Sequence, residues 1–149
     1  MSEVSLQVSA PEDVISAALT YLNRGQIEEL VALFAQKFTF KDHGIRLEFN
    51  DKHRLTEYFK KVRELYPDSF LKTDQVFVSG NHVIDEWTLA FTITEPSYAG
   101  LTSNVPISLP GTSIVRVDNG KIADWADYYD GRTARRTGLA AHFTEWVEY

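Results

Sequence analysis

The feature that most constrains the fold is a change in the spacing of apolar residues on either side of Pro67. Before it, apolar residues recur every three or four positions, which predicts helices. After it, apolar and polar residues alternate, which predicts strands. The expected helices cover residues 11–23, 26–36 and 51–66, an early strand covers 38–42, and the long strands cover 70–79, 82–94, 105–117 and 121–129. Helices followed by a meander of strands favour an α+β fold over an alternating α/β fold.

Short local signals support these boundaries. Pro11 suits the first turn of a helix, and either Asn50 or Asp51 can cap the third helix. The triplets Ser79–Asn81 and Asp118–Gly120 have the composition of hairpin turns. We therefore expect a cone-shaped α+β barrel, in which three N-terminal helices pack on a curved antiparallel sheet and leave a space suited to a ligand.

The length of 149 residues is typical of one domain. We interpret residues 1–149 as a single domain, with residues 1–10 as a loose leader and residues 131–149 as a C-terminal helical extension. No apolar run approaches the roughly 18 residues of a membrane span, and the N-terminus lacks the basic start of a signal peptide. These patterns predict a soluble, cytoplasmic protein without a membrane partner.

Composition excludes several classes of function. The net charge of −6 disfavours nucleic acid as a partner. The absence of Cys rules out disulfides and thiolate chemistry. The four His residues show no metal-ligand spacing, so no metal site is expected. The aromatic content of 13% fits a large core or a cavity lined with rings.

The late segment GKIADWADYYD contains the first candidate for chemistry. Strand alternation places Asp127 on the same face as Trp125 and Tyr129. A carboxylate among aromatic rings has a raised pKa, which suits an acid or base working near neutral pH. The alternative is a structural carboxylate that bonds a nearby Tyr hydroxyl or Arg at the end of the sheet.

The early segment LVALFAQKFTFKD ends on the second candidate. Alternation places Asp42 on the same face as Phe38 and Phe40. Asp42 also precedes a turn at His43 and Gly44, where its carboxylate could instead satisfy the backbone. If Asp42 and Asp127 face one pocket, the two can share a proton, with one acting as acid and the other as base.

Together, the two segments resemble the nuclear transport factor two-like superfamily. Its members include ketosteroid isomerase, limonene-epoxide hydrolase and SnoaL-like polyketide cyclases. The resemblance covers about Val14 to Asp130. It implies the cone-shaped fold, a pocket for a small hydrophobic molecule, and a homodimer formed through the outer face of the sheet.

The resemblance also bears on individual residues. Asp42 falls at the position of the general base of ketosteroid isomerase, and Asp127 at the position of the water-activating Asp of limonene-epoxide hydrolase. Trp87 and Leu89 stand where that hydrolase has an Arg and an Asp, and Ala18 stands where the isomerase has a Tyr donor. SnoaL-like cyclases need fewer protein donors, and the chain resembles these best.

We therefore expect a small-molecule enzyme that carries out cofactor-free acid/base chemistry, namely isomerisation, cyclisation or hydration, on a hydrophobic substrate. Asp127 is the expected principal acid/base and Asp42 its partner. The expected substrate-binding wall consists of Phe38, Phe40, Trp87, Leu89, Phe91, Trp125 and Tyr129. The alternative function is a non-catalytic ligand-binding or dimerisation module of the same fold.

Overall fold

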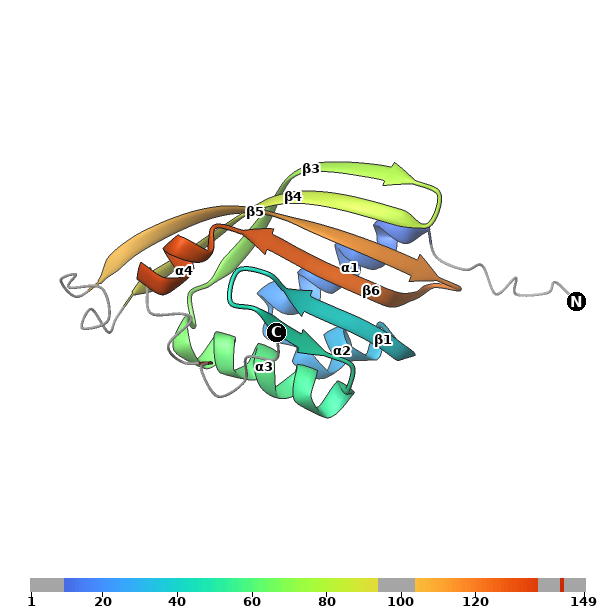
Figure 1. The fold of residues 1–149 in the computed structure, drawn as a ribbon, viewed down its shortest axis with the longest axis horizontal. Helices are drawn as coiled ribbons and strands as arrows, with labels where there is room; N and C mark the ends of the chain where they lie inside the picture. The colour runs from blue at the N-terminus through green and yellow to red at the C-terminus, as the bar shows by residue number, and fades with distance from the viewer. Residues whose placement is uncertain (1–9, 94–103, 137–142, 144–149) are drawn as a thin grey trace, which may run out of the picture.

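The computed structural model describes residues 10–93, 104–136 and 143, which form a curved, open sheet with helices against one face (Figure 1). The helices are α1 (Pro11–Asn23), α2 (Ile27–Ala32), α3 (Lys52–Leu65) and α4 (Gly131–Arg136). The strands are β1 (Phe34–Asp42), β2 (Leu47–Phe49), β3 (Phe70–Ser79), β4 (His82–Ile93), β5 (Val105–Asp118) and β6 (Lys121–Tyr129). The α+β class is confirmed, although the sheet does not close into a barrel.

The strand order β2-β1-β6-β5-β4-β3 brings the early strand β1 beside the last strand β6. This pair is parallel, whereas every other neighbouring pair in the sheet is antiparallel. Parallel pairing places the C-terminal ends of both strands at the same end of the sheet. As a result Asp42 and Asp127, which are far apart in the sequence, are register partners.

Several local signals act as predicted. Pro11 occupies the first turn of α1. The Asp51 carboxylate caps α3 by accepting the backbone N–H of Arg54 at 3.0 Å. The β5–β6 hairpin turns through Asn119 and Gly120, whose φ angles of +50° and +77° are those that a tight hairpin needs.

Two boundaries differ from the prediction by more than one residue. The second helix ends at Ala32, and β1 begins at Phe34. The apolar residues around Leu33 have a spacing that is compatible with either a helix or a strand. The chain joins the sheet here because the Leu33 carbonyl accepts the Ile122 N–H at 2.9 Å. The strand β2 was not predicted, since three residues are too few to show alternation; it pairs with β1 through Phe49 and Phe40.

The core lies between the inner face of the sheet and the helices. Helix α1 packs against β3, β4 and β5 and passes behind the sheet in Figure 1. Beyond α4, Phe143 is fully buried with its ring 5.5 Å from that of Tyr58 on α3. The predicted leader lies outside the described residues apart from Ala10, as does the rest of the predicted extension. In the described part of the chain no helix is long and apolar enough to cross a membrane.

Candidate active site

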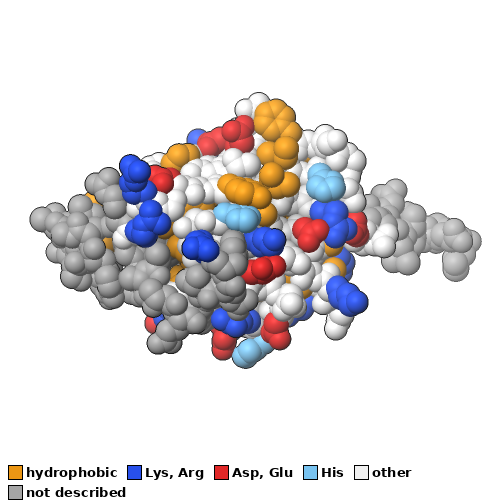
Figure 2. Space-filling model, in the orientation of Figure 1, with side chains coloured by type: hydrophobic (Ala, Val, Ile, Leu, Met, Phe, Trp, Pro, Cys, Tyr) orange, Lys and Arg blue, Asp and Glu red, His pale blue; other side chains and the backbone are white. Residues whose placement is uncertain are grey.

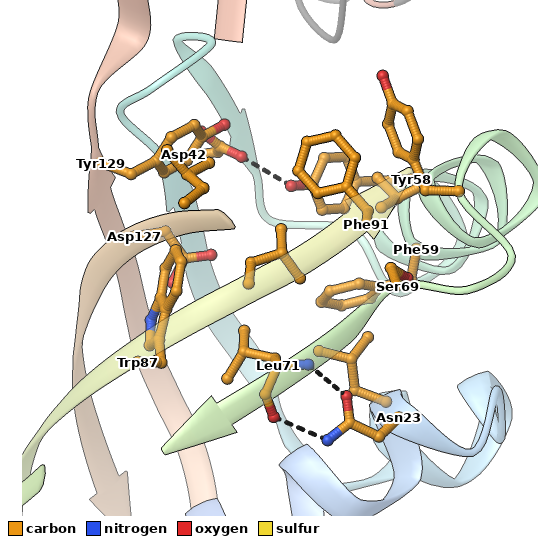
Figure 3. Close-up of a pocket in the computed structure, with 15 residues that line it drawn as sticks. Asn23, Asp42, Tyr58, Phe59, Ser69, Leu71, Trp87, Phe91, Asp127 and Tyr129 are labelled. Atoms are coloured by element: carbon orange, nitrogen blue, oxygen red, sulfur yellow. Dashed lines mark hydrogen bonds between the residues drawn. The ribbon is translucent and has the colours of Figure 1, made fainter. Parts of the chain in front are cut away.

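A cavity of about 90 Å³ lies between the inner face of the sheet and helix α3. In Figure 3, Asp42 and Asp127 lie on the sheet side of this cavity, and Tyr58 and Phe59 face them from α3. At its far end Asn23 of α1 makes two hydrogen bonds, of 2.8 and 2.9 Å, to the backbone of β3. Both the helical part and the sheet therefore hold the cavity in shape.

A row of polar residues crosses the inner face of the sheet. Asp42 on β1 is the register partner of Asp127 on β6. Asp127 in turn pairs with Ser113 on β5, and Ser113 pairs with Asp85 on β4. Register partners point to the same face, and neighbouring strands lie about 4.8 Å apart. Three carboxyl groups are thus aligned on one side of the sheet, and two of them line the cavity.

Asp127 receives two hydrogen bonds at one carboxyl oxygen. The Ser113 hydroxyl donates to Oδ1 at 2.5 Å, and the Trp125 indole Nε1–H donates to it at 2.6 Å. Trp87 Nε1–H donates to Ser113 Oγ at 2.8 Å and so directs the hydroxyl proton toward Asp127. Burial, followed by the charge of Asp42, nevertheless raises the pKa of Asp127 to about 7. Near neutral pH this carboxyl can therefore both accept and donate a proton.

Asp42 is 2% exposed and serves two purposes. Its Oδ1 accepts the Ile45 N–H at 3.1 Å and closes the turn, and its Oδ2 accepts the Tyr58 hydroxyl at 2.7 Å within the cavity. Burial raises the pKa of Asp42, while the hydroxyls of Tyr58 and Tyr129 lower it in part. Burial and the charge of Asp42 hold the pKa of Tyr58 well above its ordinary value, so Tyr58 remains a hydrogen-bond donor.

Asp85 is the third acid of the row and lies outside the cavity wall. It is fully buried, and burial raises its pKa to about 6, with the Thr73 hydroxyl lowering it and Asp74 raising it further. The charge of Asp85 contributes to the raised pKa of Asp127. Within the described residues, no three His, Asp or Glu side chains gather as metal ligands would.

The expected wall residues divide into two groups. Four line the cavity: Trp87, Leu89, Phe91 and Tyr129. The other three are not part of its wall and lie in the neighbouring core: Phe38, Phe40 and Trp125. Alternation identifies the inner face of a strand, but the cavity occupies only one end of that face.

Two glycines make room for aromatic rings of the wall. A Cβ atom on Gly111 would lie 2.2 Å from the Trp87 ring, and one on Gly44 would lie 2.1 Å from the Tyr129 ring. Each ring therefore rests directly on a glycine backbone, and any larger residue would displace it.

Sequence reasoning missed two polar residues of the site. Tyr58 was not selected, although it stands three residues after Leu55 and four before Val62 on the apolar stripe of α3. Ser113 was likewise not among the predicted site residues. Its alternation with Gly111 and Leu109 on one strand face was the available signal, because Leu109 also lines the cavity.

With this geometry in place, comparison with known proteins identifies the family. A family model described as a SnoaL-like domain matches residues 15–125. The chain belongs to the SnoaL-like domain family. The superfamily suggested by the two sequence segments is thereby confirmed. Among curated proteins, none matches the sequence.

Solved structures similar to this SnoaL-like chain share its fold. IdmH of Streptomyces antibioticus, assigned as a polyketide cyclase, is 18% identical with a TM-score of 0.75, covering 87% of this chain and 98% of its own. A Shewanella putrefaciens protein assigned as a SnoaL-like polyketide cyclase is 11% identical with a TM-score of 0.73, covering 93% and 90%. A Catenulispora acidiphila protein with a ketosteroid isomerase-like fold, in complex with trimethylamine, is 19% identical with a TM-score of 0.70, covering 82% and 88%.

Proposed function

We propose that this SnoaL-like protein is a cofactor-independent enzyme that transfers protons to and from carbon in a small, largely hydrophobic substrate. The observation that carries the proposal is the pairing of Asp42 and Asp127 as register partners in one cavity. Burial raises the pKa of both, and that of Asp127 is about 7. General acids and bases work best with a pKa near the operating pH.

The two carboxyls have different surroundings, which separates their roles. Asp127 is partly exposed to the cavity and is held by Ser113 and Trp125, so its orientation is fixed and one oxygen remains for the substrate. Asp42 is almost fully buried, and its oxygens are engaged by Ile45 and Tyr58. Asp127 is therefore the principal acid/base. Asp42 tunes its pKa by charge, and the pair shares one proton near neutral pH.

The reaction classes that fit are isomerisation, cyclisation and hydration. In isomerisation and cyclisation, Asp127 removes a proton from one atom of the substrate and returns it to another. In hydration, Asp127 removes a proton from the attacking water and delivers it to the substrate. Negative charge that develops on a substrate oxygen can accept a hydrogen bond from a Tyr hydroxyl of the wall. The apolar wall, formed by residues such as Leu89 and Phe91, binds the hydrophobic body of the substrate.

Deuterium incorporation into simple carbon acids tests this function, and the natural substrate need not be identified first. A panel of cyclic ketones and 1,3-diketones is incubated with the protein in D2O, and exchange at carbon is followed by NMR. We expect exchange with the wild type, a decrease of at least about 100-fold for Asp127→Asn, and a change below about twofold for Asp124→Asn. Asp124 lies on the same strand and serves as the matched control. Equal exchange by the Asp127→Asn variant would favour the non-catalytic binding module.

We also propose a homodimer formed through the outer face of the sheet. Phe77, Ile84 and Ile114 are register partners across β3, β4 and β5 and are 48%, 38% and 39% exposed. Figure 2 shows hydrophobic side chains gathered in a band over these strands. A contiguous apolar band of this kind favours association. Light scattering should give twice the chain mass for the wild type and the monomer mass for Ile84→Glu; a monomeric wild type contradicts the proposal.

A further inference from the structure

Six aromatic residues of the wall form three neighbouring pairs around the cavity. The ring centroids are 4.5 Å apart in Tyr66–Phe91, 5.2 Å in Tyr58–Phe59 and 6.2 Å in Trp87–Tyr129. These pairs come from α3 and its C-terminal end, β4 and β6, so they surround the space from several sides. The face of an aromatic ring attracts a cation that lies within about 6 Å of its centroid.

The charged side chains of the wall add to this attraction. They are Asp42 and Asp127, both acids. The hydrogen bonds that Asp127 receives come from neutral groups, the Ser113 hydroxyl and the Trp125 indole. A neutral donor offsets less of the charge of a carboxylate than a cation does. Low-dielectric walls focus the negative potential that remains into the cavity.

The size of the cavity restricts the group that enters. Its volume of about 90 Å³ is smaller than the ~150 Å³ cavity that accommodates benzene. A space of this size holds one compact group of a substrate, such as a trimethylammonium group or a small ring. Ring walls and carboxylates around such a space describe a receptor for a small cation.

We propose that the cavity binds the compact alkylammonium group of a cationic substrate, with the aromatic rings around its alkyl carbons and the Asp127 carboxylate beside its charge. This inference rests on the proposed function and specifies its substrate class. When Asp127 takes a proton from carbon, the electron pair of the broken bond stays on the substrate. A positive charge close to that carbon stabilises the developing negative charge.

A pair of probes that differ only in charge tests the inference. Choline and 3,3-dimethylbutan-1-ol have the same shape, but only choline carries a positive charge. Binding is followed at pH 8 by the NMR shift of the Trp87 indole N–H, which lies in the cavity wall. We expect choline to bind at least tenfold more tightly than the alcohol. Equal affinity, weaker binding of choline, or no binding of either probe overturns the proposal.

Variants locate the effect at Asp127. The titratable groups around it are Asp42 on β1, Tyr58 on α3, Tyr129 on β6 and, one strand further away, Asp85 on β4. Asp127→Asn should reduce the preference for choline to below threefold, whereas Asp124→Asn on the outer face should retain it.

A preference that Asp127→Asn leaves unchanged overturns the proposal. A wild type that shows no preference for choline but still catalyses deuterium exchange on neutral ketones rejects this inference and leaves the proposed function intact. A preference for choline without any exchange rejects the proposed catalysis instead.

Discussion

Strand β6 carries two aspartates that face opposite sides of the sheet and have opposite partners. On the outer face, the Arg116 Nε–H donates to Asp124 Oδ2 at 2.7 Å, and Arg116 Nη2 forms an ion pair with the same oxygen at 2.7 Å. On the inner face, Asp127 accepts a hydroxyl and an indole N–H and has the Asp42 carboxyl beside it. The outer carboxylate is stabilised by a cation, whereas the inner one is surrounded by neutral donors and another acid. The partners, rather than the residue type, decide which of the two can exchange a proton near neutral pH.

The raised pKa values of the inner carboxyls also affect the stability of the fold. A carboxyl whose pKa is higher in the folded state than in the unfolded chain stabilises the fold only while it is protonated. That stability is fully present below the unfolded pKa, near 4, and is lost as the pH rises through the folded pKa. The inner acids thus give the protein a free energy of unfolding that decreases toward neutral pH, which is a cost of keeping acids of this kind in the site.

The largest predicted effect is at Asp127, whose pKa is raised from 3.8 to about 7. The free energy of unfolding of the wild type should fall by up to about 4 kcal/mol between pH 4 and pH 8 on account of this group. Asp127→Asn removes the titration, so the variant should exceed the wild type in stability at pH 8 and match it near pH 4. Urea unfolding at both pH values measures the difference.

Asp124→Asn is the matched control for this experiment. Its carboxylate lies on the outer face and has Arg116 as partner. The substitution should leave the pH slope unchanged. If the free energy of unfolding has the same pH slope in the wild type and in Asp127→Asn, Asp127 titrates at an ordinary pKa. The proposed difference between the inner and outer carboxylates would then be wrong.

The second effect is at Asp85, whose pKa is raised to about 6 mainly by burial. Stability from this group is present below about pH 4 and is lost as the pH rises through 6. We expect Asp85→Asn to be more stable than the wild type by about 2 to 3 kcal/mol at pH 8, because the variant has no buried group that must become charged there. The pKa of Asp127, followed by carboxyl carbon NMR, should also decrease. No change in either quantity would show that Asp85 is not coupled to the row.

A third effect distinguishes two tyrosines. Tyr58 donates to Asp42 at 2.7 Å inside the cavity, whereas Tyr128 is 44% exposed on the outer face and stacks on His43 at 4.4 Å. Tyr58→Phe should raise the pKa of Asp42 and cost about 1 to 2 kcal/mol at pH 8, where the lost bond is to a charged group. The cost should be smaller at pH 5. Tyr128→Phe should change neither quantity, and an equal response of both variants would argue against a special role for the inner hydroxyl.

Much of the fold could be predicted from local patterns. The change of apolar period indicated the order of helices and strands, and residues with conformational roles, such as Pro11, Asp51 and Gly120, marked the ends correctly. The errors fell where the local signal is weak: α2 meets β1 at Leu33 within an apolar run compatible with both structures. The parallel pairing of β1 with β6 is a long-range contact that no local pattern encodes.

The site was predictable only in part, for the same reason. Alternation put Asp127 and Asp42 on inner faces, and the family resemblance drew attention to both. Their contact depends on the β1–β6 register, and the donor Tyr58 comes from a helix in another part of the chain. Phe40 was predicted to line the cavity but lies in the core, although it is on the expected face of its strand. Local alternation identifies that face, whereas the position of the cavity depends on packing in three dimensions.

The smallest predicted effect concerns the outer face. Arg116 interacts with both Asp118 and Asp124, and all three side chains are partly exposed. Arg116→Met should cost only about 0.5 kcal/mol in 0.1 M salt, and less in 1 M salt, because exposed ion pairs are weak and screened. The pH slope between 4 and 8 should stay that of the wild type, since no inner carboxyl loses a partner. A loss above about 2 kcal/mol, or a changed slope, would show that the outer charges support the inner acids through the sheet and that the two faces are not electrostatically independent.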